Sequence, residues 1–119
     1  MKSYDYFFKV CSDGEINEVK RLSSLLNPTY NNNRAIQWAS YNGHLEVVKF
    51  LASLPGVDPT ALDNYAFRRA SQCGHLEVVK FLSSLAGVDP TALDNFAIRW
   101  ACENGHLEVV KFLVLLPGV

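Results

Sequence analysis

The chain has 119 residues, of which 49% are hydrophobic and 19% charged, and its formal net charge is −1. This length corresponds to one domain, and the composition is too apolar for a disordered chain. The balanced charge argues against the basic surface of a protein that binds nucleic acid or a membrane surface, and no apolar run reaches the roughly 18 residues of a membrane span.

The N-terminal segment, residues 1–33, is the most divergent of four repeated units. Its stretch 14–22 aligns with a nonapeptide, Gly-His-Leu-Glu-Val-Val-Lys-Phe-Leu, that occurs unchanged at 43–51, 74–82 and 105–113. The second helix expected here carries a polar stripe, which suits the outer face that a terminal repeat presents to water. That stripe consists of Glu15, Asn17, Glu18, Lys20 and Arg21. The segment is therefore predicted to be an N-terminal cap.

No targeting signal is recognised in the opening residues, because acidic residues interrupt them and they lack the apolar stretch of a secretory signal. The three cysteines, Cys11, Cys73 and Cys102, show no C-x-x-C spacing, so neither a disulfide framework nor a zinc cluster is expected. Cys11 and Cys102 share one position, three before their glycines, and are expected to be small buried residues. A reducing, cytoplasmic location fits these features.

Each of the following units predicts two short helices. In the unit 65–95, a first helix is expected over 65–73, with a side-chain oxygen of Asp63 or Asn64 capping its N-terminus. Gly74 ends this helix, because a glycine readily takes a positive φ. A second helix is expected from about 75 to 85, where apolar residues recur at helical spacing.

Such short helices are marginal alone in water, and a single two-helix unit cannot bury its own apolar face. Stacked neighbours solve both problems. The units 34–64, 65–95 and a shortened 96–119 repeat with a period of 31 residues, and Ala39, Ala70 and Ala101 recur where neighbouring first helices need a close approach. The sequence therefore predicts one domain over 1–119, an all-α solenoid of about four stacked helix-turn-helix repeats.

The repeated pattern resembles the ankyrin repeat family over about 110 of the 119 residues. Gly-His-Leu-Glu-Val-Val, followed by Leu and then Gly-Val-Asp, resembles that family's second helix and exit, and the segments beginning at Arg34 and Phe96 resemble its first helix. The family's first-helix His is replaced by Gln37, Arg68 and Arg99, and the period is 31 residues instead of about 33. The resemblance therefore implies shortened loops between repeats, in place of the family's projecting hairpin finger.

What the resemblance implies is a non-catalytic module, without a cofactor, that binds a protein partner on a concave face built by first helices and loops. Within the near-identical frame, the positions nine, two and one before the turn glycine vary, so packing does not dictate them. Aromatic and arginine side chains at such positions suit an interface hot spot. The candidate partner-binding residues are Arg34, Tyr41, Asn42, Tyr65, Gln72, Cys73, Phe96, Glu103 and Asn104. For each of them, simple drift of an exposed position is the open alternative.

The recurring His44, His75 and His106 could suggest a metal site. Packed helices stand about 8–10 Å apart, however, which is too far for one ion to bridge two repeats. No metal is therefore expected. Each histidine is instead expected to support the first turn of its own second helix by hydrogen bonding.

Two further patterns are interpreted as structural. The triplet 73–75, Cys-Gly-His, could pair a thiolate with a base, but the equivalent triplets begin with Asn, so no catalysis is expected. Trp38, Arg69 and Trp100 recur at one position of the first helix. Such a row could bind a peptide or stack a base, but a scaffold role is favoured.

The last unit, 96–119, differs at its end. Where earlier units have Ala-Ser or Ser-Ser, this one has Val114 and Leu115, followed by Leu116. Two interpretations stay open. In one, the chain is a piece or a short member of a longer array. In the other, Val114, Leu115 and Leu116 form a surface for weak self-association, which makes the protein a structural or assembly element.

Overall fold

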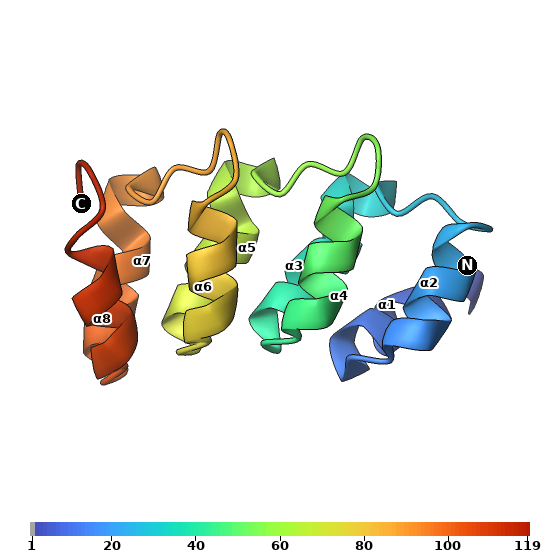
Figure 1. Ribbon diagram of the computed structural model, residues 1–119, viewed down its shortest axis with the longest axis horizontal. Coiled ribbons are helices and arrows are strands. Elements are labelled where there is room, and N and C mark those ends of the chain that lie inside the picture. The colour runs from blue at the N-terminus through green and yellow to red at the C-terminus, as the bar shows by residue number, and fades with distance from the viewer. Residues whose placement is uncertain (1) are drawn as a thin grey trace.

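The computed structural model describes residues 2–119, so Met1, the first residue of the predicted unit 1–33, lies outside it. The helices are α1 (Lys2–Asp13), α2 (Ile16–Ser23), α3 (Tyr30–Tyr41), α4 (Leu45–Ala52), α5 (Ala61–Gln72), α6 (Leu76–Ser83), α7 (Ala92–Glu103) and α8 (Leu107–Leu113). Residues 2–119 contain no β-strand. Figure 1 shows the pairs α1–α2, α3–α4, α5–α6 and α7–α8 side by side along the 40 Å long axis. The predicted all-α helix-turn-helix solenoid is therefore confirmed.

The two helices of each pair lie in separate layers. In Figure 1, α3 and α5 lie behind α4 and α6. Consecutive first helices contact one another, consecutive second helices do the same, and the other extensive contacts join the two members of a pair. Each pair thus covers the apolar side of the next. None of the helices in the described part of the chain is both long and apolar enough to cross a membrane.

The first helices approach closely because small residues line their contact. Ala39, Ala70 and Ala101 are fully buried, which confirms the prediction made from their spacing. In the second layer, Val47 and Leu51 are also fully buried. Burying one such side chain contributes about 1.5–3 kcal/mol, against about 0.2–0.5 kcal/mol for an ion pair on a helix surface. Apolar stacking therefore outweighs the surface charges in holding the pairs together.

A histidine from the following pair covers the turn of the preceding pair. Nε2 of His75 donates to the carbonyl oxygen of Tyr41 at 2.9 Å, and a Cβ at Gly43, whose φ is +77°, would lie 2.5 Å from Nδ1 of His75. His44 donates in the same way to the carbonyl of Ser12 at 2.8 Å. Neither histidine makes a capping bond to its own helix. The predicted bond within one repeat is wrong, because the free carbonyls lie at the end of the preceding first helix.

A left-handed turn of three residues precedes the right-handed part of α3, α5 and α7. These turns are residues 31–33, 62–64 and 93–95, with φ between 52° and 63°. Asp63 and Asn64 lie inside the second turn, and no side-chain capping bond is present at the start of α5, so the predicted cap is wrong. The guanidinium of Arg68 closes the turn instead, since its Nε donates to the Asp63 carbonyl at 2.9 Å. This compact turn is the shortened loop that the 31-residue period predicts.

Consecutive loops are tied by asparagine side chains from these turns. Oδ1 of Asn33 accepts from the backbone N–H of Asp58 at 2.8 Å, and Oδ1 of Asn64 accepts from that of Asp89 at 2.9 Å. The Asp89 carboxylate in turn accepts from the hydroxyl and the N–H of Thr91, and these two bonds lower the pKa of Asp89. The loops therefore form a hydrogen-bonded row along one edge of the stack.

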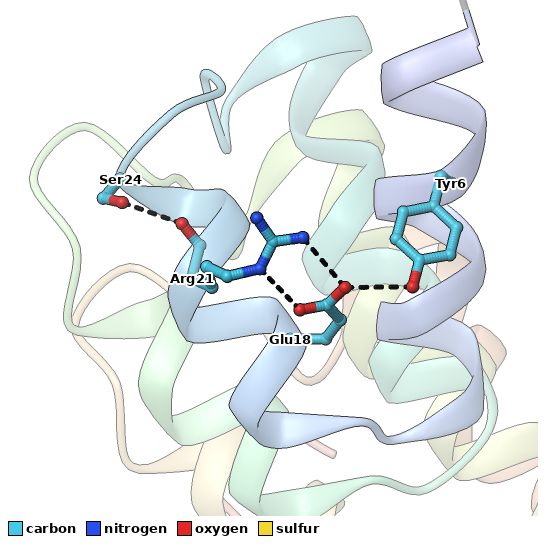
Figure 2. Close-up of polar contacts among 4 residues, drawn as sticks. All are labelled: Tyr6, Glu18, Arg21 and Ser24. Carbon is cyan, nitrogen blue, oxygen red and sulfur yellow. Dashed lines mark hydrogen bonds and ion pairs between the residues drawn. The ribbon is translucent and has the colours of Figure 1, made fainter.

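The first pair carries a network of polar contacts on its surface. Figure 2 shows the Glu18 carboxylate accepting from Nε of Arg21 at 2.7 Å and from the Tyr6 hydroxyl at 3.0 Å. These bonds, that of Arg21 foremost, lower the pKa of Glu18 to about 2. The Ser24 hydroxyl donates to the carbonyl of Arg21 at 2.7 Å. On this surface α1 and α2 are thus joined by polar contacts. These polar groups carry no desolvation cost, because the surface stays in contact with water.

Candidate functional site

One stripe of each first helix stays accessible in the stack. It follows positions i, i+4 and i+7, which lie on one face of a helix. Its members are exposed or half-buried, whereas Ala35, Ile36 and Ala39 beside them are buried. We call this surface the first-helix face. It comprises Arg34, Trp38 and Tyr41 on α3, Tyr65, Arg69 and Gln72 on α5, and Phe96, Trp100 and Glu103 on α7.

A groove of about 450 Å³ lies on this face between α3 and α5. Its lining residues are Arg34, Gln37, Trp38, Tyr41, Leu62, Tyr65 and Arg69. Three of the nine predicted partner-binding residues, Arg34, Tyr41 and Tyr65, therefore meet in one concavity. The rings of Trp38 and Tyr41 stand edge to face with centroids 6.0 Å apart, so the α3 wall is aromatic.

The other six predicted residues lie elsewhere on the stack. Asn42 and Asn104 tie neighbouring turns, because their Nδ2 atoms donate to Oγ of Ser12 at 2.9 Å and to the carbonyl of Gln72 at 3.2 Å. Cys73 is half-buried at the end of α5, and Glu103 is exposed on α7. The two asparagines thus have a structural contact that their variable positions did not indicate.

Phe96 and Tyr65 hold two adjacent guanidinium groups. The Cζ atom of Arg68 lies 4.8 Å from the Phe96 ring centroid and 5.3 Å from that of Tyr65. That of Arg69 lies 5.0 Å from Tyr65 and 5.6 Å from Phe96. Burial first, and then the charge of Arg69, lowers the pKa of Arg68. Stacking on an aromatic face fixes a guanidinium and offsets part of its desolvation.

Four groove residues were not among the predicted partner-binding residues: Gln37, Trp38, Leu62 and Arg69. Trp38 and Arg69 were expected to be scaffold, but both line the groove, and Trp38 is 37% exposed. Leu62 was not singled out, although an apolar residue inside a polar loop is a recognisable signal. It is 49% exposed and forms part of the groove wall.

The three predicted self-association residues differ in environment. Val114 is exposed, Leu115 is 81% exposed, and Leu116 is half-buried against the core. Ser53 and Ser84, the counterparts of Leu115, are exposed as well. Leu115 therefore lies on a stripe that is accessible in every pair, not on the end of the stack.

The end of the stack is marked by other residues, which we call the C-terminal face: Asn95, Cys102, Gly105 and Leu107. Leu107 is 61% exposed, whereas its counterparts in α4 and α6 are half-buried. Among residues 2–119, no heavy atom outside Gly105 and its chain neighbours lies within 4 Å of a Cβ built on Gly105, and the buried Oδ1 of Asn95 has no partner. Cys102 is exposed, so its predicted burial is wrong, while Cys11 is buried as predicted. The counterparts of Cys102 are buried because another pair follows them.

The geometry offers little for metal binding or nucleophilic chemistry. Among residues 2–119, no three His, Cys, Asp or Glu side chains come together as a possible metal site. Burial raises the pKa of Cys73 and lowers that of His75. An activated thiolate needs the opposite shift in its cysteine. The Cys-Gly-His triplet thus lacks the environment of a nucleophile and base.

Comparison with known proteins agrees with the architecture. A family model described as ankyrin repeats (many copies) matches residues 37–83 and 74–114. The X-ray structure of an ankyrin repeat family protein from Legionella pneumophila is similar over 96% of this chain, with 30% sequence identity and a TM-score of 0.83. This chain spans 37% of that protein's chain. No curated protein sequence matches the chain.

Ankyrin repeats generally mediate protein–protein interactions and are typically non-catalytic. The matched residues include all three copies of the Gly-His-Leu-Glu-Val-Val motif. The resemblance stated from the sequence is confirmed, and the chain belongs to the ankyrin repeat family.

Proposed function

We propose that the protein is a non-catalytic binding module whose protein partner docks on the first-helix face, the concave face expected of the family, without a cofactor or metal. The single observation that supports this most is the groove between α3 and α5. Tyrosine, tryptophan and arginine dominate interface hot spots, and all three residue types line this groove. A hollow lined in this way accepts protruding side chains of a partner.

The packing of the groove favours binding over a structural role for these side chains. Trp38, Tyr41 and Leu62 each leave apolar area accessible to water, at a cost that burial by a partner removes. Their neighbours Ala35 and Ala39 carry the contacts of the stack. The exposed stripe is therefore free to change with the partner while the fold stays the same.

The proposal is tested by affinity purification from the native host with the wild-type chain and with the double variant Trp38→Ala/Tyr41→Ala. We expect the wild type to retain a specific partner and the variant to lose it, with a reduction in affinity of about tenfold or more. Lys49→Ala on the exposed surface of α4 is the matched control. Equal recovery of the partner by a folded groove variant would contradict the proposal.

A second candidate function is association between copies through the C-terminal face. Three features of this face favour it. A covering surface would bury the exposed side chain of Leu107 and the uncovered Gly105. It would also supply a donor to the buried Oδ1 of Asn95, which has no partner among residues 2–119. The predicted residues Val114 and Leu115 add exposed apolar area at the same end of the chain.

The N-terminal end is a poor complement for that face. Glu15 stands where other units have the histidine that covers the preceding glycine, and the N–H of Asn27, the counterpart of Asp58, already donates to the Tyr4 hydroxyl at 3.0 Å. Association therefore joins like ends about a two-fold axis, and not head to tail.

Light scattering over a concentration series tests this second candidate. We expect the mean mass of the wild type to rise with concentration, and the variant Leu107→Ser/Val114→Ser to stay monomeric. Leu115→Ser changes the outer stripe and leaves the C-terminal face intact. We expect this variant to reduce the self-association less than Leu107→Ser/Val114→Ser does. A wild-type chain that stays monomeric at high micromolar concentration would eliminate this function.

The proposed binding module acts in a cytoplasmic, reducing compartment. The thiols of Cys11, Cys73 and Cys102 are all free, and Cys102 is exposed. An exposed free thiol is most compatible with a compartment in which thiols stay reduced.

A further inference from the structure

The groove between α3 and α5 carries positive charge that no carboxylate balances. Arg34 and Arg69 are its two charged lining residues, and no Asp or Glu lines it. The ion pairs among the described side chains are Lys9–Asp13, Arg21–Glu18 and Lys111–Glu108. None of these involves an arginine of the first-helix face.

The hydrogen-bond donors of Arg69 are only partly satisfied. One terminal nitrogen donates to Oε1 of Gln72, while the other terminal nitrogen makes no hydrogen bond among residues 2–119 and so can donate to a ligand; Nε is buried without a partner and out of a ligand's reach. The neighbouring Arg68 has its donors occupied within the chain, because its Nε and Nη2 donate to the carbonyls of Asp63 and Leu62. Arg69 is therefore the guanidinium of this adjacent pair that is available to a ligand.

The position of Arg69 is also set in advance. Its guanidinium lies over Tyr65 at 5.0 Å from the ring centroid and near Phe96 at 5.6 Å. A guanidinium held on an aromatic face loses less conformational entropy when it binds. A carboxylate is its best-matched acceptor, because two parallel N–H donors fit the two carboxylate oxygens.

Apart from Gln37, the rest of the groove lining is apolar or aromatic. Trp38, Tyr41, Leu62 and Tyr65 surround the two guanidinium groups. This combination suits a bulky apolar side chain next to an acidic one. It suits a nucleic acid poorly, because the groove offers only two guanidinium groups and the chain as a whole has a net charge of −1, whereas a nucleic acid needs a basic surface that follows several phosphates.

We propose that the groove recognises an acidic peptide segment of the partner, in which an Asp or Glu carboxylate pairs with Arg34 and Arg69 and a neighbouring aromatic or aliphatic side chain packs against Trp38 and Tyr65. This inference rests on the proposed function of the first-helix face, and it names the chemistry of the partner. The carboxylate supplies the negative charge that the groove itself lacks, and the apolar neighbour covers the exposed aromatic wall.

The test is a selection of displayed random peptides of about 12 residues on the immobilised full chain. We expect the selected peptides to be enriched in Asp or Glu next to an aromatic or aliphatic residue. A synthetic peptide of the enriched sequence should bind about tenfold more weakly to Arg34→Gln and to Arg69→Gln. Its affinity should also fall when the salt concentration rises from about 0.15 M to about 0.5 M.

Two variants make the outcomes separable. Lys49→Gln removes one positive charge from the exposed surface of α4 and should change the affinity less than twofold. Trp38→Ala reports on whether a selected peptide occupies the groove, and thermal melts of all variants confirm that they fold.

Two results overturn this inference and leave the proposed function standing. In one, the selected peptides need Trp38 for binding but lack acidic residues. In the other, they need Trp38 but bind equally well to Arg34→Gln and Arg69→Gln. Selected peptides that are unaffected by Trp38→Ala, or a selection that yields none, contradict both. Tighter binding of a single-stranded RNA of about 12 nucleotides, dependent on the same arginines, also overturns the peptide assignment.

Discussion

The side chain of Arg68 donates from Nε to the carbonyl oxygen of Asp63 at 2.9 Å, five residues earlier in the chain. Its Nη2 also donates to the carbonyl of Leu62 at 3.1 Å. Both carbonyls belong to a left-handed turn of three residues without a glycine. Left-handed backbone costs about 1–2 kcal/mol per residue for a side chain such as leucine. Arg68 therefore stabilises a conformation that its neighbours would not adopt alone.

Replacing Arg68 with Ala should lower the stability of the chain by about 1–3 kcal/mol, because two part-buried hydrogen bonds from a charged donor are lost. The conservative variant Arg68→Gln should recover most of this loss. In the preceding unit, Gln37 stands at the same position and closes the left-handed turn through a hydrogen bond from its Nε2 to the Asn32 carbonyl at 2.8 Å. Urea unfolding followed by circular dichroism measures both.

Lys80→Ala, an exposed substitution on α6, is the control for Arg68→Ala. The role assigned to Arg68 is wrong if Arg68→Ala unfolds within about 0.5 kcal/mol of this control.

The repeat pattern predicts much of this fold, for physical reasons that lie within one unit. Gly74 ends a helix because glycine takes positive φ cheaply, and Ala70 is buried because only a small residue allows first helices to touch. The left-handed turn at residues 62–64 could not be predicted in the same way. Asp63 and Asn64 tolerate left-handed backbone as single residues, but Leu62 does not, and a run of three depends on Arg68 and on the N–H of Asp89 in the next loop.

The site was only partly predictable for a related reason. Variation at Arg34, Tyr41 and Tyr65 indicates positions that the core does not constrain, and these residues do line the groove. Trp38 was expected to be scaffold, because the family that the sequence resembles often carries a large residue at this position. Its exposure depends on how α3 and α5 are placed side by side, which a single unit does not encode.

The turn glycines offer a prediction with an internal control. Gly43 has φ +77° and is covered by the ring of His75, whereas Gly105 has φ +74° with no atom near its missing Cβ. Gly105→Ala should therefore cost only the conformational penalty, about 1 kcal/mol. Gly43→Ala should cost about 2 kcal/mol more, because the ring must move and lose its bond to the Tyr41 carbonyl.

Denaturant unfolding of the two glycine variants decides whether this histidine contact matters. Equal losses for Gly43→Ala and Gly105→Ala would show that only backbone conformation is at stake. In Gly74→Ala the ring of His106 must also move, but among residues 2–119 it has no hydrogen bond to the preceding turn, so this variant should show only the steric part of the extra loss.

Stability should decline in mild acid because of His75. Burial, opposed by the bond to the Tyr41 carbonyl, holds the pKa of His75 below its usual value of 6.5. The folded chain then binds a proton there less readily than the unfolded chain does. The stabilising contribution is therefore complete above pH 6.5 and is lost as the pH falls through the lower folded pKa.

Urea midpoints at a series of pH values from about 7.5 to about 5 measure this decline. His75→Gln keeps a donor for the Tyr41 carbonyl but cannot titrate, so its midpoint should depend less on pH. Glu18 adds little to this decline, since its stabilising contribution is complete well above its ordinary pKa of 4.5 and is lost only as the pH falls below that value. A pH dependence that is the same in wild type and His75→Gln would assign the decline to other groups.

The last prediction concerns the asparagines that join consecutive loops. Oδ1 of Asn64 accepts the N–H of Asp89 at 2.9 Å, while the buried Oδ1 of Asn95 has no partner among residues 2–119. The two residues have nearly the same backbone, with φ of 61° and 60°. Replacing either with Ala therefore brings a similar conformational cost, but only Asn64→Ala breaks a bond between repeats.

Asn64→Ala should be less stable than Asn95→Ala by about 1 kcal/mol, the net worth of one such hydrogen bond. Removing Oδ1 of Asn95 even relieves a buried acceptor without a donor, which offsets part of the conformational cost there. Equal losses measured by urea unfolding would mean that asparagine is used at these positions for its tolerance of left-handed backbone alone. The hydrogen bonds between loops would then contribute nothing to the free energy of unfolding, and the apolar contacts between helices alone would stabilise the stack.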